Sequence, residues 1–100
     1  MATWKHTVKF SDFYNNNEIT LQDKASSIVS ILKKFKEKNE TKMDCDCLEV
    51  VIDNFESLSE TIKSDDKREE NIDSYTNEFN GIMYDLYDFA DEERIWIETV

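Results

Sequence analysis

The side chains of this chain that could carry out chemistry are two cysteines, one histidine and many carboxylates. The segment MDCDCLE, residues 43–49, offers ligands for a thiophilic metal ion, namely Cys45, Cys47, Asp44 and Asp46. A structural zinc site usually needs four ligands in two separated pairs, and the sequence has no second Cys/His pair. Because alternate residues at a helix start point in different directions, we expect no metal site and interpret Cys47 as a small apolar residue at the core edge.

Nucleophilic catalysis requires a base beside the nucleophile, and the only histidine is His6. His6 lies in an alternating apolar segment, so we interpret it as a structural side chain. A chain with one glycine cannot form a glycine-rich phosphate loop. The carboxylates are too numerous for any pair to stand out as an acid and a base. We therefore expect no enzyme activity, no catalytic residue and no cofactor.

Charge is unevenly distributed along the chain, whose net charge is −11. Residues 1–42 contain eight lysines and five acids, whereas residues 43–100 contain four basic residues and eighteen acids. An acidic surface of this size repels nucleic-acid phosphates and attracts basic surfaces. We expect no direct binding to nucleic acid and a partner protein with a basic surface; solubility alone is the alternative explanation for the charge.

The composition predicts one domain, residues 1–100, because 39% of the residues are hydrophobic and a chain of this length can bury a core. No apolar run approaches the roughly 18 residues of a transmembrane helix, and the first residues lack the apolar core of a signal peptide. We therefore expect a cytoplasmic protein without membrane contact. The two cysteines are too close in sequence for an unstrained bridge, so we expect thiols in a reducing compartment.

Hydrophobic periodicity predicts two strands and three helices that would position these side chains. Alternation predicts a strand in TWKHTVKF, with one face directed to the core: Trp4, His6, Val8 and Phe10. The short β-branched run Ile95–Ile97 predicts a second strand. Apolar residues at spacings of three and four predict three helices. The first begins near Thr20, which is a plausible N-cap with Asp23 as a weak capping-box partner. The second runs over about 46–62 and the third over about 69–90.

The predicted fold class is α+β. The lack of proline and the single glycine argue against an all-β fold, which needs turn residues at many corners. Two strands are marginal alone but stable against a helical layer. We expect a three-helix layer packed on a two-stranded antiparallel sheet formed by the chain ends, in the order β-α-α-α-β.

The third predicted helix carries the candidate partner-binding surface. With Phe79 at the centre of a buried face that extends from Ile72 to Ala90, the opposite face is polar and contains an exposed glycine and tyrosine. A glycine there allows close approach of another chain, and tyrosine is enriched at interfaces. The alternative is a solvated acidic face with a tolerated glycine. The candidate residues are Gly81, Tyr84, Asp85, Asp88 and Asp91.

The two ends of the chain carry the segments WKHT, residues 4–7, and YDFADEERIWI, residues 87–97. Together they resemble a family of small proteins encoded by tailed bacteriophages. Members open with a Trp-Lys-His/Tyr-Thr segment and close with a Tyr-Asp-x-Ala-Asp…Arg-x-Trp-Ile segment. The matching residues cover roughly a quarter of the chain: Trp4, Lys5, His6, Thr7, Tyr87, Asp88, Ala90, Asp91, Arg94, Trp96 and Ile97. The resemblance implies a phage accessory protein that acts in the host cytoplasm, and it brings no specific activity. We interpret Asp91 and Arg94 as an ion pair that holds the turn into the last strand.

Charge and resemblance together predict a non-enzymatic accessory protein that binds and modulates, most simply inhibits, a host or anti-phage defence protein through its acidic helical surface. One form of this function is mimicry of nucleic acid, because carboxylates at spacings of three and four can imitate a row of phosphates. The alternative is a structural or assembly component that forms a small oligomer through apolar surface around Trp96.

Overall fold

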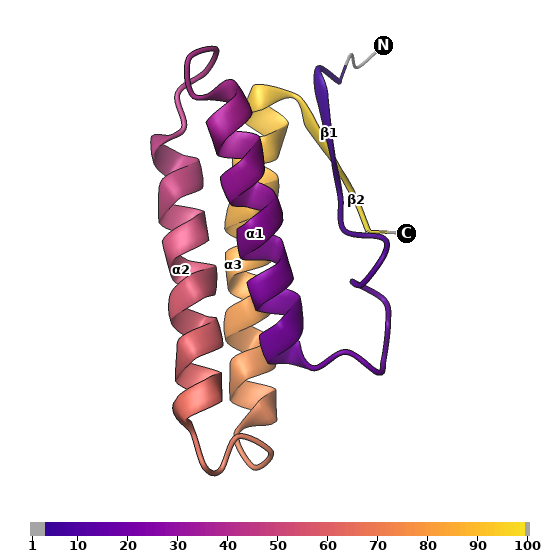
Figure 1. Ribbon diagram of the computed structural model, residues 1–100, viewed down its shortest axis with the longest axis vertical. Helices are drawn as coiled ribbons and strands as arrows, with labels where there is room; N and C mark the ends of the chain where they lie inside the picture. The colour runs from indigo at the N-terminus through magenta and orange to yellow at the C-terminus, as the bar shows by residue number, and fades with distance from the viewer. Residues whose placement is uncertain (1–3, 100) are drawn as a thin grey trace.

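Three antiparallel helices form a bundle, and the two ends of the chain form a sheet along one side of it (Figure 1). The computed structural model describes residues 4–99. The elements are β1 (His6–Lys9), α1 (Leu21–Asn39), α2 (Asp46–Ser64), α3 (Ile72–Glu93) and β2 (Ile95–Glu98). The predicted α+β composition and the order β-α-α-α-β are confirmed.

The strands pair in parallel, so the antiparallel pairing expected from the sequence is wrong. In the register, His6 lies opposite Ile95 and Lys9 lies opposite Glu98. The reason is chain direction: in Figure 1 β1 descends, α1 ascends, α2 descends, α3 ascends and β2 descends. Because every one of the connections reverses the chain and their number is even, the last strand runs in the direction of the first.

A side chain caps α1 at its predicted start, whereas α3 begins later than predicted. The Thr20 hydroxyl accepts a hydrogen bond from the Asp23 amide at 3.1 Å, which confirms Thr20 as the N-cap of α1. The start of α3, by contrast, lies after the predicted Glu69 because the preceding loop folds around Asp65. The Asp65 carboxylate accepts hydrogen bonds from the Lys67 amide, the Asn71 side-chain amide and the Tyr75 hydroxyl.

The core fills the space between the three helices and continues beneath the sheet. Phe55 is fully buried and meets Phe79 edge-on, with ring centroids 5.5 Å apart. The irregular segment between β1 and α1 also contributes, because Phe10 and Phe13 are buried and Tyr14 packs against Phe79. This segment therefore holds the sheet against the bundle as well as joining β1 to α1.

Three side chains expected in the core are exposed. Trp4 is 43% exposed because it precedes the regular strand, so the alternation of β1 does not extend to it. Ile72 is 41% exposed because it is the first residue of α3, at the end of the bundle. Cys47 is exposed and Cys45 is buried instead, since Cys45 and Leu48 are three residues apart and share the inward face of α2.

The turn from α3 into β2 depends on backbone conformation. Arg94 has φ 59° and ψ 48°, the left-handed region, and its amide donates to the carbonyls of Ala90 and Asp91. No ion pair joins Asp91 to Arg94 in residues 4–99, so the predicted charge interaction is wrong. A left-handed residue at the C-cap is a common way to end a helix, although the position usually holds glycine.

Candidate partner-binding surface

An aromatic–acidic surface lies where the end of α3 meets the outer face of the sheet. We define it by Trp4, Tyr84, Tyr87, Asp88, Asp91 and Trp96. The sequence dictates this arrangement locally, because Ile95 and Ile97 point into the core and the strand period of two then turns Trp96 outward. Lys5 donates its amide to the Arg94 carbonyl at 2.7 Å, which brings the chain just before β1 beside this strand.

The two tryptophans form a pair at the centre of this surface. Their ring centroids are 5.3 Å apart and their planes make an angle of 61°, the edge-to-face geometry that aromatic rings prefer. Trp4 is 43% exposed and Trp96 is 46% exposed, so the contact leaves much of both rings in solvent. A surface with two adjacent exposed tryptophans displays a residue type enriched at interface hot spots.

A shallow hollow of about 440 Å³ lies between this tryptophan pair and α3. Its charged side chains are the carboxylates of Asp88 and Asp91, and Tyr87 and Thr99 line it as well. Neither carboxylate forms an ion pair in the described part of the chain, where the two ion pairs, Lys33–Glu56 and Lys36–Glu49, join α1 to α2. The hollow therefore combines aromatic rings with uncompensated negative charge, which suits a cationic side chain.

Tyr87 also connects this surface to the core. It lies beside the phenol of Tyr14, and burial, followed by the charge and hydrogen bonding of Tyr87, raises the pKa of Tyr14. The phenol of Tyr14 is therefore neutral at physiological pH. One residue of the surface is thereby held in place by a partly buried neighbour rather than by solvent contacts alone.

The structure brings only some of the predicted residues to the hollow. Asp88 and Asp91 line it, and Tyr84, 70% exposed, is one turn earlier on the same side of α3. Gly81 is two turns before Asp88, and a side chain added there would meet no atom within 4 Å. Asp85 lies about 160° around the helix from Tyr87, so it faces away from the hollow and its role stays a prediction.

Sequence reasoning did not place Trp4, Tyr87 or Trp96 on the candidate partner-binding surface, although the alternative of an oligomer named apolar surface around Trp96. The signal for Trp96 was present, because a residue between two inward-facing isoleucines of a strand must face outward. No local pattern could find Trp4, whose position depends on the parallel register rather than on its own segment.

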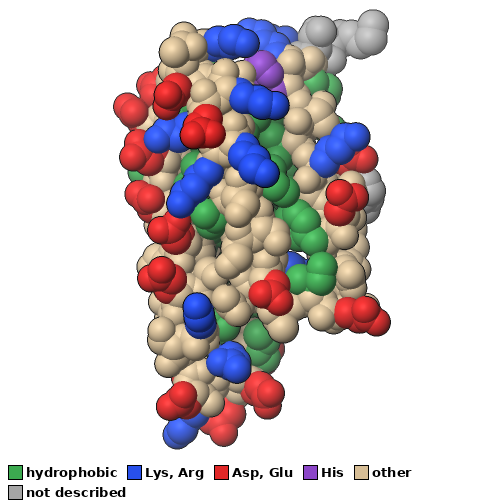
Figure 2. All heavy atoms as spheres, viewed as in Figure 1, with side chains coloured by type: hydrophobic (Ala, Val, Ile, Leu, Met, Phe, Trp, Pro, Cys, Tyr) green, Lys and Arg blue, Asp and Glu red, His purple; other side chains and the backbone are tan. Residues whose placement is uncertain are grey.

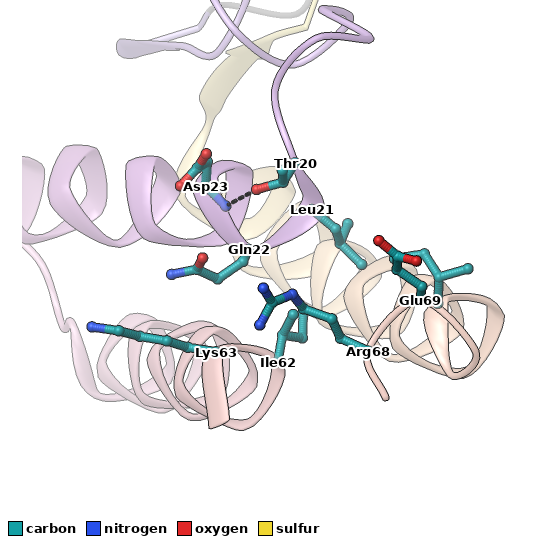
Figure 3. Close-up of a pocket in the computed structure, with 9 residues that line it drawn as sticks. Thr20, Leu21, Gln22, Asp23, Ile62, Lys63, Arg68 and Glu69 are labelled. Atoms are coloured by element: carbon teal, nitrogen blue, oxygen red, sulfur yellow. Dashed lines mark hydrogen bonds between the residues drawn. The ribbon is translucent and has the colours of Figure 1, made fainter. Parts of the chain in front are cut away.

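A second cavity of about 470 Å³ lies at the opposite end of the bundle (Figure 3). It is enclosed by the first turn of α1, the last turn of α2 and the loop before α3, with an apolar lining of Leu21, Ile62 and Ile72. In Figure 3 Arg68 extends across it toward Gln22. Its charged lining mixes two cations with two acids, Lys63, Arg68, Asp23 and Glu69, so the polar groups do not converge on a ligand of one charge.

Among residues 4–99 no group of three or more His, Cys, Asp or Glu side chains is placed to hold a metal ion. No helix in that part of the chain is long and apolar enough to cross a membrane. Comparisons with protein-family models, with curated proteins and with solved structures found no match to this chain.

Proposed function

We propose that this protein is a non-enzymatic accessory protein that binds a basic surface of another protein through the aromatic–acidic surface. The observation that carries the proposal is the exposed pair Trp4 and Trp96 beside the unpaired carboxylates of Asp88 and Asp91. Aromatic rings supply buried area on binding, and the carboxylates supply charge complementarity and faster association. The single histidine, His6, lies on the α1 side of the sheet rather than at this hollow.

The resemblance at the chain ends supports a proposal for the origin of this protein and for the partner that it binds. The two blocks that resemble tailed-phage accessory proteins meet where the sheet adjoins the end of α3, with Trp4 against Trp96 and the Lys5 amide bonded to the Arg94 carbonyl. This proximity supports treating the two blocks as one functional unit. We propose a phage accessory protein in the host cytoplasm whose partner is a host or anti-phage defence protein, and whose effect is inhibition.

Nucleic-acid mimicry is the specific form of this proposal that the charge favours. Asp85, Asp88, Asp91 and Glu92 are all exposed along the outer side of α3. Carboxylates spaced in this way present negative charge to a groove that normally binds phosphates. Binding of this kind weakens steeply with salt, because it depends on exposed charges that are screened over roughly 8 Å at physiological ionic strength.

Affinity capture from host lysate at 50 and at 300 mM salt, with identification of the captured protein, tests the proposal. We expect a basic protein that is retained at low salt and released by a nucleic-acid competitor. A triple variant, Trp96→Ala with Asp88→Asn and Asp91→Asn, should lose it. A control variant, Asp53→Asn with Glu60→Gln, removes the same number of negative charges from the exposed face of α2 and should retain the captured protein. Equal retention by both variants would refute the proposed surface.

A small homo-oligomer of structural or assembly function is the second candidate, and the exposed tryptophan pair also favours it. Two copies that buried Trp4 and Trp96 against each other would remove the largest exposed aromatic group of the sheet from water. Light scattering separates the candidates. A monomer that captures a basic partner agrees with the first, and a stable oligomer that Trp96→Ala dissociates agrees with the second.

A further inference from the structure

A groove lined with lysines lies between β1 and α1, away from the aromatic–acidic surface. Its volume is about 500 Å³. Figure 2 shows lysine side chains gathered around the single histidine over this part of the molecule. The lysines that line it are Lys9, Lys34, Lys38 and Lys42. His6 lines it as well, and none of its lining residues is acidic. In a protein with a net charge of −11, this is a local field of the opposite sign.

The lysines of this groove come from three separate segments. Lys9 belongs to β1, Lys34 and Lys38 belong to α1, and Lys42 follows the helix. A cation near a helix C-terminus is stabilised by the helix dipole, which accounts for Lys38 but not for Lys9 on the strand. The fold thus collects charges that a helix alone would not place together.

These lysines are free of the ion pairs that occupy their neighbours. Lys33 and Lys36 of the same helix bond to Glu56 and Glu49 on α2, at 2.8 and 3.7 Å. None of the lysines that line the groove forms an ion pair within residues 4–99. The nearest acid in the sheet register is Glu98, opposite Lys9, and it does not line the groove. The positive charge of the groove is therefore available to a ligand.

The floor of the groove is formed by side chains that pack on one another. His6 meets Phe35 edge-on, with ring centroids 5.5 Å apart, and Val8 is buried beside it. The side-chain amide of Asn39, also buried, donates to the Phe35 carbonyl at 2.9 Å and is satisfied. The groove therefore has a base of packed side chains and a rim of ammonium groups, each a compact point charge that binds phosphate well.

We propose that this groove binds a small ligand that carries a chain of linked phosphate groups, such as a nucleoside triphosphate. Several ammonium groups around one hollow exceed what a single phosphate can neutralise, and they match a ligand with several adjacent charges. The acidic face of α3 disfavours a long polyanion such as duplex nucleic acid. A compact ligand is attracted to the groove, because repulsion from distant acids is screened beyond roughly 8 Å at physiological salt.

Isothermal titration with ATP, tripolyphosphate and AMP, at pH 7 and 50 mM salt without added magnesium, tests the proposal. We expect ATP and tripolyphosphate to bind at least about tenfold more tightly than AMP, and binding to weaken several-fold at 300 mM salt. Equal affinity for ATP and tripolyphosphate would mean that the groove recognises the phosphate chain alone. Tighter binding of ATP would mean that its nucleoside also contacts the floor around Phe35. Either result supports the site.

Two matched variants separate a site from bulk charge. Lys34→Gln with Lys38→Gln should reduce ATP affinity about tenfold or more, since it removes two of the point charges that bind phosphate. Lys33→Gln with Lys36→Gln removes the same charge from the other side of α1 and should change it less than about twofold. Circular dichroism verifies that both variants fold. Absence of ATP binding at millimolar concentration, equal losses in both variants, or tighter binding of a single-stranded oligonucleotide than of ATP would each overturn the proposal.

Discussion

Replacement of Arg94 distinguishes a conformational role from an ionic one at the turn between α3 and β2. Arg94 is the only residue other than glycine with a positive φ in the described chain, at 59°. A non-glycine residue in the left-handed region costs roughly 1–2 kcal/mol. Glycine removes that cost, but it lowers the free energy of unfolding by about 0.4–1 kcal/mol because it gives the unfolded chain more conformational freedom. We therefore expect Arg94→Gly to be more stable than Arg94→Ala by about 1 kcal/mol.

The assay is thermal unfolding followed by circular dichroism at constant pH and salt. For a domain of this size, about 1 kcal/mol corresponds to a difference in Tm of roughly 4–8 °C. Arg94→Ala keeps the Cβ atom and the strain, and it removes only the guanidinium, which forms no ion pair in the described structure. The alanine variant should therefore melt close to the parent, while the glycine variant melts higher.

Two results would refute this reasoning. If Arg94→Ala lost about 1 kcal/mol or more relative to the parent, the guanidinium would contribute through an interaction such as the Asp91 ion pair. If Arg94→Gly were less stable than Arg94→Ala, the residue would not occupy the left-handed region in solution. Asp91→Asn is the matching control, because it would remove an ion pair with Arg94 by neutralising the carboxylate while leaving the backbone at Arg94 unchanged.

The remaining predictions test the loop before α3, the thiols and the exposed glycine. Hydrogen bonds from Tyr75, and then from Asn71 and the Lys67 amide, hold the pKa of the Asp65 carboxyl below its ordinary value of 3.8. The stability that these hydrogen bonds contribute is therefore complete above pH 3.8, and it is lost as the pH falls through the lower pKa of the folded protein. In denaturant titrations over this pH range, the free energy of unfolding should decrease less for Asp65→Asn than for the parent protein. Cys47 should react with a thiol reagent in the native protein, whereas Cys45, whose thiol pKa is raised chiefly by burial, should react only on unfolding. Gly81→Ala should raise the free energy of unfolding by up to about 1 kcal/mol in chemical denaturation, since nothing obstructs the added methyl group; a loss of stability would contradict the exposed helical environment.

The helices were predictable because their stability depends on patterns within one segment. Apolar residues at spacings of three and four marked the buried stripes of α1 and α2, and the Thr20 cap was readable from its residue type. The start of α3 was not predictable in this way. It depends on the Asp65 carboxylate, which gathers donors from an irregular loop whose path no periodicity describes.

The direction of the strands could have been predicted by counting reversals. Short polar connections join antiparallel helices. When the longer segment between β1 and α1 and the turn from α3 into β2 also reverse the chain, the last strand runs parallel to the first. The expectation of an antiparallel sheet considered only that two isolated strands at the chain ends must pair. It omitted the orientation that the three helices impose on β2.

The candidate surfaces were harder to predict because each joins residues that are distant in sequence. The acidic residues of α3 were recognisable as one helix face, but the tryptophan pair joins position 4 to position 96. The lysine groove similarly joins Lys9 to Lys42. Excess lysine in residues 1–42 indicated that a basic region existed, and only the packing of β1 on α1 shows where it lies.

The parallel sheet also separates the two charged surfaces of the molecule. β1 contacts α1 and β2 contacts α3, so the groove lysines lie along one side of the sheet and the α3 carboxylates lie along the other. The two surfaces share no lining residue. Substitutions in the groove should therefore leave partner capture by the aromatic–acidic surface unchanged, and substitutions at Asp88 and Asp91 should leave ATP binding unchanged apart from a weak, salt-screened effect. A large coupling between them at physiological salt would mean that bulk charge, rather than two local sites, governs both interactions.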